Sequence, residues 1–185
     1  LTNLASALSD SGDNATARPL FEEAVALHRR TLGNNHPDTL DAIGRLGGLL
    51  SRMGDDAGAQ PLLEEALAGL RLALGDDDDV LLQAMSRLAL VHGMLGATAK
   101  ARLLFEEAVV VRRRTFPADP NTFSMIGNLG GTIFIAGDCT AGLALREEAA
   151  ASALRELGPE HPYTQSSTDM LAHMRQDIKA VSGTC

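Results

Sequence analysis

Apolar and small residues recur along this chain at helical spacing, and one such pattern occurs four times. Each copy places an alanine, a bulky apolar residue and a second alanine at positions i, i+4 and i+7, which share one face of an α-helix. The copies begin at Ala17, Ala59 and Ala101, with a fainter one at Gly142. They are separated by 42, 42 and 41 residues (59 − 17, 101 − 59 and 142 − 101). A constant period of this size indicates a stacked array of helical repeats.

Glycine-containing breaks divide the apolar stripes into nine predicted helices with short connections. Gly33, for example, ends one stripe, and Asp38 or Thr39 is expected to cap the helix that follows. No segment carries the alternating pattern of a strand. We therefore expect an all-α fold in which antiparallel helix pairs stack in register. The predicted helices span residues 1–10, 15–32, 38–52, 57–74, 80–95, 99–116, 122–136, 140–157 and 163–181.

The composition suits such an array and argues against nucleic-acid binding and against a membrane span. Apolar residues make up 45% of the 185 residues and aromatic residues only 3%, so aliphatic side chains must fill a continuous core. The net charge of −8 repels phosphate backbones, and no basic stretch is interleaved with aromatic residues, so we expect no nucleic-acid binding. No apolar run approaches the roughly 20 residues that span a bilayer.

Chemistry-bearing residues do not gather into a recognisable motif. The Glu22–Glu23 pair and its repeats point about 100° apart on a helix and away from the apolar face, so we expect them in solvent rather than in an acid–base pair. The acidic run 76–79 suits the start of a helix and lacks the closing Glu of an EF-hand calcium loop. Cys139 and Cys185 show no paired spacing, so neither a disulfide framework nor a zinc site is expected. We expect no catalytic residue, no cofactor and no metal, and hence no enzyme.

Small and large residues recur in phase within each repeat; in the first repeat they are Leu4-Ala5, Leu8, Gly12, Ala17, Phe21 and Ala24. This series resembles the tetratricopeptide repeat. The longer unit of 42 residues, with Gly33-x-x-His36-Pro37-Asp38-Thr39 between units, is similar to the repeats of kinesin light chains. The resemblance implies a right-handed superhelical solenoid that forms one domain over residues 1–185. Its repeats would cover about 1–42, 43–84, 85–125 and 126–167, followed by a terminal helix over 168–181.

Three positions depart from the repeat. His92 stands where the other units carry Leu or Ile, and we expect a buried, hydrogen-bonded histidine there. Gly142 and Arg146 stand in the fourth unit where the others carry Ala and a bulky apolar residue. Burying that arginine without a partner would be costly, so either its helix docks differently or the array is nearing its end.

The resemblance implies that the first helix of each unit lines a concave wall that binds ligands. Asn3, Arg45, Arg87 and Asn128 occupy equivalent places one period apart on that wall. Arginines that face inward on an acidic chain predict a locally positive trough, which favours acidic or C-terminal peptide segments as ligands. The predicted partner-binding residues are Asn3, Ser6, Arg45, Gly48, Arg52, Arg87, Leu90, Met94, Asn128, Gly131 and Phe134.

Several positions on the same concave wall are glycines, which have no side chain. Gly47 and Gly130 are expected to allow close packing of helix on helix. Four others have no such explanation, although each costs about 1 kcal/mol relative to Ala within a helix. Either a helix or an extended segment of a partner approaches the backbone there, or these glycines are a tolerated weakness of an ordinary solenoid. The four are Gly44, Gly48, Gly127 and Gly131.

These observations predict an interaction protein rather than an enzyme. The leading hypothesis is a scaffold or adaptor that holds a peptide or helical segment of a partner protein, of acidic character, in its concave groove. The alternative is a structural subunit of a larger multiprotein assembly, engaged through its convex face or its ends. Because residue 1 already lies inside a repeat, we expect a fragment of a longer chain. We expect an intracellular, cytoplasmic location and leave open an organelle-targeting segment on the parent chain.

Overall fold

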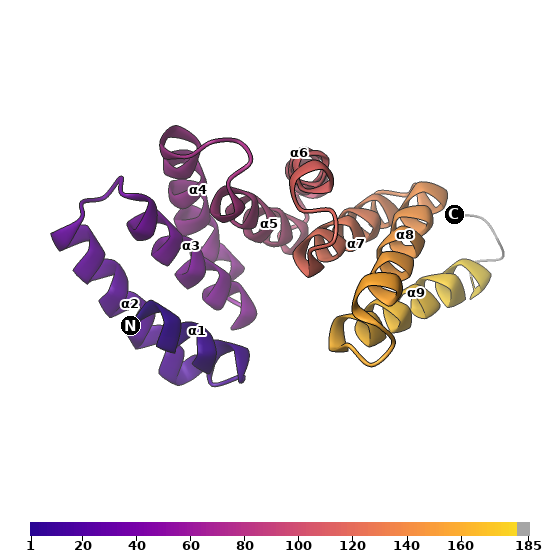
Figure 1. Ribbon diagram of the computed structural model, residues 1–185, viewed down its shortest axis with the longest axis horizontal. Coiled ribbons are helices and arrows are strands. Elements are labelled where there is room, and N and C mark those ends of the chain that lie inside the picture. Colours follow the sequence, from indigo (N-terminus) through magenta and orange to yellow (C-terminus); the bar gives the residue numbers. More distant parts are fainter. Residues whose placement is uncertain (181–185) are drawn as a thin grey trace. The chain divides into compact units, whose positions relative to one another are not determined.

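The computed structural model describes residues 1–180 and consists of helices joined by short connections (Figure 1). The helices found there correspond one by one to the predicted ones, with ends that differ by at most two residues. The last predicted end, residue 181, lies outside the described residues. No strand occurs between residues 1 and 180, so the all-α fold is confirmed. The helices are α1 (Thr2–Asp10), α2 (Asn14–Thr31), α3 (Pro37–Arg52), α4 (Asp56–Ala73), α5 (Asp79–Met94), α6 (Thr98–Thr115), α7 (Pro120–Ile135), α8 (Cys139–Leu157) and α9 (Pro162–Ala180).

The helices form two compact units. Unit 1 spans Leu1–Gly96 and contains α1 to α5, and unit 2 begins at Ala97 and contains α6 to α9. In unit 1, α2 packs against α1 and α3, α3 packs against α4, and α5 packs against both α3 and α4. In unit 2, α7 packs against α6 and α8, and α9 packs against α7 and α8. Within each unit, consecutive helices therefore stack on their neighbours, as the repeat pattern predicts.

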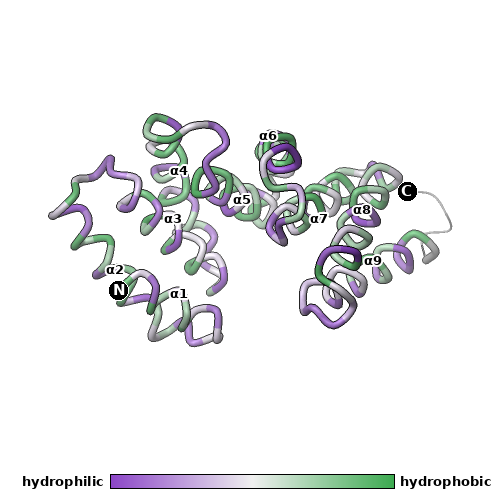
Figure 2. The backbone as a smooth tube through the Cα atoms, in the orientation of Figure 1, coloured by the Kyte–Doolittle hydropathy of each residue, from purple (hydrophilic) through white to green (hydrophobic). Residues whose placement is uncertain are grey.

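The recurring alanine motif forms the interior of both units. In α2, Ala17, Phe21 and Ala24 are at most 1% exposed, and the corresponding residues of α4 and α6 are equally buried. The alanines let neighbouring helices approach, and the bulky residue fills the space between them. His92 is only 5% exposed, which confirms that this histidine is buried. Hydrophobic and hydrophilic positions alternate along the helices (Figure 2). No helix among residues 1–180 is both long enough and apolar enough to cross a membrane.

Side chains that accept a backbone N–H fix where the helices start. Asp13 caps α2 by accepting an N–H from the first turn at 3.2 Å. For α3 the predicted cap was wrong, because the cap is His36, whose Nδ1 accepts from the N–H of Asp38 at 3.2 Å. Pro37 occupies the first helical position, where its missing N–H does no harm, so the cap falls two residues before Asp38.

The capping position of His36 recurs in the later linkers, where its chemistry changes. Asp78, Asp119 and His161 follow it at intervals of 42, 41 and 42 residues (78 − 36, 119 − 78 and 161 − 119). Asp78 and Asp119 cap α5 and α7 by accepting the N–H two residues ahead, at 2.8 and 2.7 Å. His161 uses its Nδ1 in the same way at 3.1 Å. The acidic run 76–79 therefore starts a helix, as predicted.

Cys139, at the start of α8, is buried. It takes part in a disulfide, which corrects the expectation that the cysteines form none. Spacing along the sequence could not reveal this bond, because pairing depends on the distance between Cα atoms in the folded chain. Cys185 lies outside the described residues.

Candidate partner-binding site

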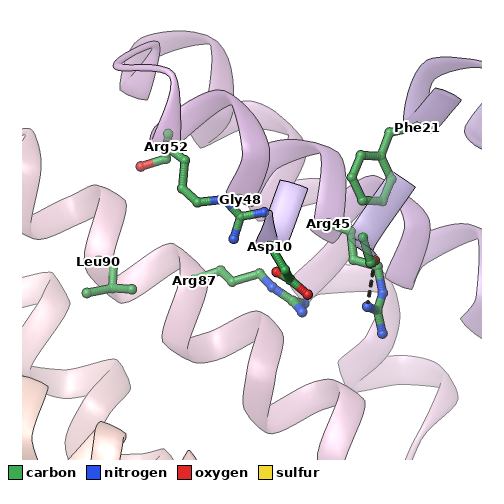
Figure 3. Close-up of a pocket in the computed structure, with 9 residues that line it drawn as sticks. Asp10, Phe21, Arg45, Gly48, Arg52, Arg87 and Leu90 are labelled. Atoms are coloured by element: carbon green, nitrogen blue, oxygen red, sulfur yellow. Dashed lines mark hydrogen bonds between the residues drawn. The ribbon is translucent and has the colours of Figure 1, made fainter. Parts of the chain in front are cut away.

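A pocket of about 330 Å³ lies in unit 1 among α1, α2, α3 and α5 (Figure 3). Six of the predicted partner-binding residues line it together. Of the three further lining residues, Asp10, Phe21 and Ser51, the first two were not predicted to face a ligand. Asp10 follows Ser6 by one helical turn, and this spacing was the available signal. We call this hollow the arginine pocket, and its lining residues are Ser6, Asp10, Phe21, Arg45, Gly48, Ser51, Arg52, Arg87 and Leu90.

Arg45 is held by a carboxylate on its own helix. Its Nε donates to Oδ2 of Asp41, one turn earlier on α3, at 2.7 Å. Its Nη1 donates to the hydroxyl of Ser6 on α1 at 3.2 Å (dashed line in Figure 3). These hydrogen bonds fix the guanidinium between α3 and α1, and the Asp41 carboxylate offsets much of its charge.

Arg87 of α5 lies across a glycine face of α3. A methyl group on Gly48 would meet Cδ of Arg87 at 3.3 Å, and one on Gly44 would approach its Nη1 at 3.8 Å. Nη2 donates to Oε1 of Gln83 at 3.0 Å, and Nη1 lies 3.8 Å from Oδ1 of Asp41. The side chain is only 22% exposed, and this burial lowers the pKa of Arg87, while the nearby Asp41 carboxylate acts in the opposite direction.

These contacts correct the hypothesis that an external segment fills the space over the unexplained glycines. In unit 1 the chain's own Arg87 occupies the space over Gly44 and Gly48. In unit 2, Arg146 does the same over Gly127 and Gly131. The sequence could not show this, because in unit 1 the covering arginine lies a whole repeat away from the glycines.

Arg52 carries the charge of the pocket that is least compensated. It is exposed, and its Nη2 donates to the hydroxyl of Ser9 on α1 at 2.6 Å. Within residues 1–180 it has no carboxylate partner at ion-pair distance. A guanidinium has five N–H donors, so most of those of Arg52 remain available to a ligand.

Two predicted residues of unit 1, Asn3 and Met94, do not line this pocket. Asn3 lines a neighbouring hollow of about 300 Å³ together with Asp41 and Arg45. Leu90 and Met94 lie one turn apart on α5 and are 45% and 74% exposed. The arginine pocket thus offers positive charge at its centre and an apolar edge on α5.

In unit 2, the predicted residues Asn128, Gly131 and Phe134 lie on α7. A methyl group on Gly142 of α8 would come within 2.7 Å of both the Phe134 backbone nitrogen and the Gly130 carbonyl oxygen. The two helices therefore cross in contact at their glycines, which confirms the packing role predicted for Gly130. The departure at Gly142 is explained in the same way, because α8 docks more closely than an alanine would allow.

The paired glutamates are solvent-accessible, as predicted. In unit 1, Glu65 of α4 accepts from Arg29 of α2 at 2.7 Å, with both side chains more than 40% exposed. In unit 2, Glu148 of α8 pairs with Arg113 of α6, also at 2.7 Å. These carboxylates join helices of neighbouring repeats at the surface and do not converge on a common site.

Solved structures with the same fold include two of a Podosopora anserina protein, provisionally described as a kinesin light chain with nearly identical TPR-like repeats, one of them a variant with a single glutamine replaced by methionine. Both are 25% identical to this chain and cover 95% of it and 83% of their own length, with TM-scores of 0.78 and 0.77. BtubC (BKLC) from P. vanneervenii is 18% identical over 86% of this chain and 63% of its own, with a TM-score of 0.71, and supports the fold alone. No curated protein is significantly similar in sequence.

The repeat sequence itself gives the family. A family model described as tetratricopeptide repeat matches residues 1–71 and again residues 42–114. Together the matches span residues 1–114, more than half of the 185 residues. Helix pairs of this kind present extended binding surfaces and are typically non-catalytic. The chain therefore belongs to the tetratricopeptide repeat family of protein-interaction scaffolds, with repeats like those of kinesin light chains.

Proposed function

We propose that unit 1 binds an acidic segment of a partner protein in the arginine pocket. The observation that carries this proposal is the gathering of three guanidinium groups around one hollow of about 330 Å³ in a chain whose net charge is −8. Positive potential confined to one hollow on an acidic surface attracts and orients an acidic ligand.

The three arginines have different roles in this proposal. Arg52 anchors a carboxylate of the ligand, because its charge is exposed and its hydrogen-bond partner is the neutral Ser9 hydroxyl. Arg45 and Arg87 position the site, because Asp41 already lies against both of them. A bidentate pair between a guanidinium and a carboxylate adds directional specificity to the attraction.

The acidic residues of the site limit what it accepts. Asp10 lines the pocket and Asp41 lies beside it, so three positive charges are set against two negative ones. A polyanion would meet Asp10 and Asp41, whereas a single acidic side chain can reach Arg52 without approaching either. Beside it, Leu90 and Met94 offer apolar surface. We therefore infer that the ligand carries an acidic residue next to an apolar one.

Fluorescence anisotropy with synthetic peptides tests this function. A labelled peptide of alternating Glu and Leu should bind, and its Gln and Leu counterpart should bind more weakly. Because a charged hydrogen bond contributes about 1.5–3 kcal/mol, Arg52→Glu should weaken the Glu peptide at least about tenfold. Arg18→Glu is the matched control, since Arg18 lies on the exposed face of α2 and pairs with Glu22. Equal affinities of the Arg52→Glu variant and the control would refute the proposal.

A structural role in a larger assembly is the second candidate. Leu103 and Val110 of α6 are 66% and 70% exposed. They are seven residues apart, so they share one face of the helix. Paired exposed apolar residues of this kind favour a contact with another protein. Sedimentation velocity of the chain and of its Leu103→Gln, Val110→Gln variant tests this role, which predicts self-association or partner binding that the variant loses.

A further inference from the structure

Arg146 of α8 stands where the other copies of the motif bury a bulky apolar residue. The corresponding residues Phe21, Leu63 and Phe105 are at most 1% exposed. Arg146 is half-buried, and its guanidinium lies on the glycine face of α7. Its Nη2 is 2.8 Å from where a methyl group on Gly131 would be. The glycines of α7 thus leave space over the helix backbone for the charged group of Arg146.

This guanidinium has no counter-charge within residues 1–180. Nη1 donates to Sδ of Met170 at 3.4 Å, and a thioether sulfur is a weak acceptor. Nε is buried without a hydrogen-bond partner. Burial lowers the pKa of Arg146, and the only group that acts against this effect is Tyr163. Two other arginines of unit 2 have acidic partners, since Arg113 and Arg175 pair with Glu148 and Glu147 at 2.7 Å. An arginine remains charged even when it is partly buried, so the Arg146 guanidinium favours the binding of an anion that the chain itself does not supply.

A second donor lies beside it. The hydroxyl of Tyr163 on α9 would be 3.4 Å from a methyl group on Gly127, and Nη1 of Arg146 would be 3.3 Å from the same point. Guanidinium N–H and phenol O–H groups therefore converge over Gly127. One positive charge with one neutral donor suits a singly charged, planar oxyanion, whereas a phosphate dianion would leave a negative charge uncompensated.

We propose that Arg146 and Tyr163 form a second binding site, separate from the arginine pocket, which takes one carboxylate group of a partner protein. The half-exposed edge of the guanidinium receives the two carboxylate oxygens, and the Tyr163 hydroxyl donates to one of them. This site uses only residues of unit 2 and does not depend on the function proposed for unit 1.

Acetate, the simplest carboxylate, is the probe. The Nε–H signal of Arg146 in an NMR spectrum is identified by its loss in Arg146→Leu. When acetate replaces chloride at constant ionic strength, this signal should shift in a saturable way, and so should the backbone amides of Gly127 and Gly131. Under the same exchange, the melting temperature of the wild-type chain should rise, because acetate binds only the folded state.

Three variants complete the test. Arg146→Leu should lose the acetate response while keeping its helix content, because Leu is the residue of the second repeat at this position. Tyr163→Phe should weaken the response without abolishing it. Arg102→Leu, which removes an exposed arginine paired with Glu106 in the same unit, should respond like the wild type. An unchanged acetate response in Arg146→Leu, or no Arg146 shift in the wild type, would overturn the proposal.

Discussion

In each unit an arginine side chain covers a pair of glycines four residues apart, but the arginine belongs to a different helix of the repeat in each unit. In unit 1 it is Arg87, from the first helix of the next repeat, over Gly44 and Gly48. In unit 2 the place equivalent to Arg87 is held by Met170, since 87 − 44 and 170 − 127 both equal 43. The glycines of α7 are instead covered by Arg146.

The acid that accompanies the arginine is also lost between the units. Asp41 lies three residues before Gly44 and pairs with Arg45 while lying near Arg87. Three residues before Gly127, unit 2 carries Ser124. In both units a guanidinium therefore lies over a pair of glycines, but only the one in unit 1 has a carboxylate nearby to offset its charge. A repeat can thus keep its backbone design while changing the charge that it presents to a partner.

The largest expected effect comes from the glycines that touch backbone rather than an arginine side chain. Gly142→Ala should destabilise unit 2 by about 3 kcal/mol, because its new methyl group would meet backbone atoms of α7 that cannot yield. Denaturant unfolding followed by circular dichroism measures this loss. Gly93→Ala is the control: Gly93 lies in α5 with open space around it, and the change should stabilise by about 0.5–1 kcal/mol. Similar effects for the two variants would contradict the crossing of α7 and α8 described above.

Exchanging the covering arginines should have opposite effects in the two units. Arg87→Met copies the residue of unit 2 and should destabilise by about 1–2 kcal/mol, because it leaves Asp41 with one cation fewer and Gln83 without its donor. Arg146→Leu should be neutral or stabilise by up to about 1 kcal/mol, because it removes a half-buried charge without a partner. Thermal unfolding in chloride buffer compares the two variants. Equal losses would show that the two arginines are equivalent.

Alkaline pH should affect the two units differently. Burial raises the pKa of Tyr163, whereas Ser167 and Arg146 act to lower it. A raised pKa favours the neutral phenol in the folded state, so this stabilisation is present below the pKa of an unfolded tyrosine, about 10, and is lost as pH rises through the folded pKa. Tyr163 is the single tyrosine of the chain, so tyrosinate absorbance follows it directly. Arg146→Leu should raise this pKa further, and a lower value in that variant would contradict the proximity of the two groups.

The smallest effect should come from restoring the missing acid. Ser124→Asp places a carboxylate at the position of Asp41, where it can pair with Arg146. We expect a gain of about 0.5 kcal/mol at low salt that disappears at high salt, because a partly exposed ion pair is screened. Melting temperatures over a salt series measure this gain. The Ser124→Asp variant should also lose the acetate response proposed for Arg146. Ser86→Asp, which adds the same charge to α5 of unit 1, is the control.

The repeat pattern predicted what depends on neighbours along a helix. Ala17 and Phe21 were placed in the interior correctly, because the apolar stripe and the packing face are one feature. The contacts of Arg87 and Arg146 were beyond the pattern, since a long side chain reaches a glycine face on another helix. The cap at His36 was missed for a different reason: an imidazole can take the acceptor role that sequence rules give to Asp, Ser or Thr. Gathering Ser6, Arg45 and Arg87 around one hollow required the stacking of α1, α3 and α5.

The capping position changes from His36 to Asp78 and Asp119 and back to His161, and the two kinds of cap accept an N–H differently. A carboxylate such as that of Asp78 or Asp119 can accept through either of two equivalent oxygens. A neutral imidazole accepts only through the ring nitrogen that carries no hydrogen, so the caps of α3 and α9 require the tautomer of His36 and His161 that has its hydrogen on Nε2. The first and the last of these four linkers therefore each keep a ring N–H donor that the two linkers between them lack.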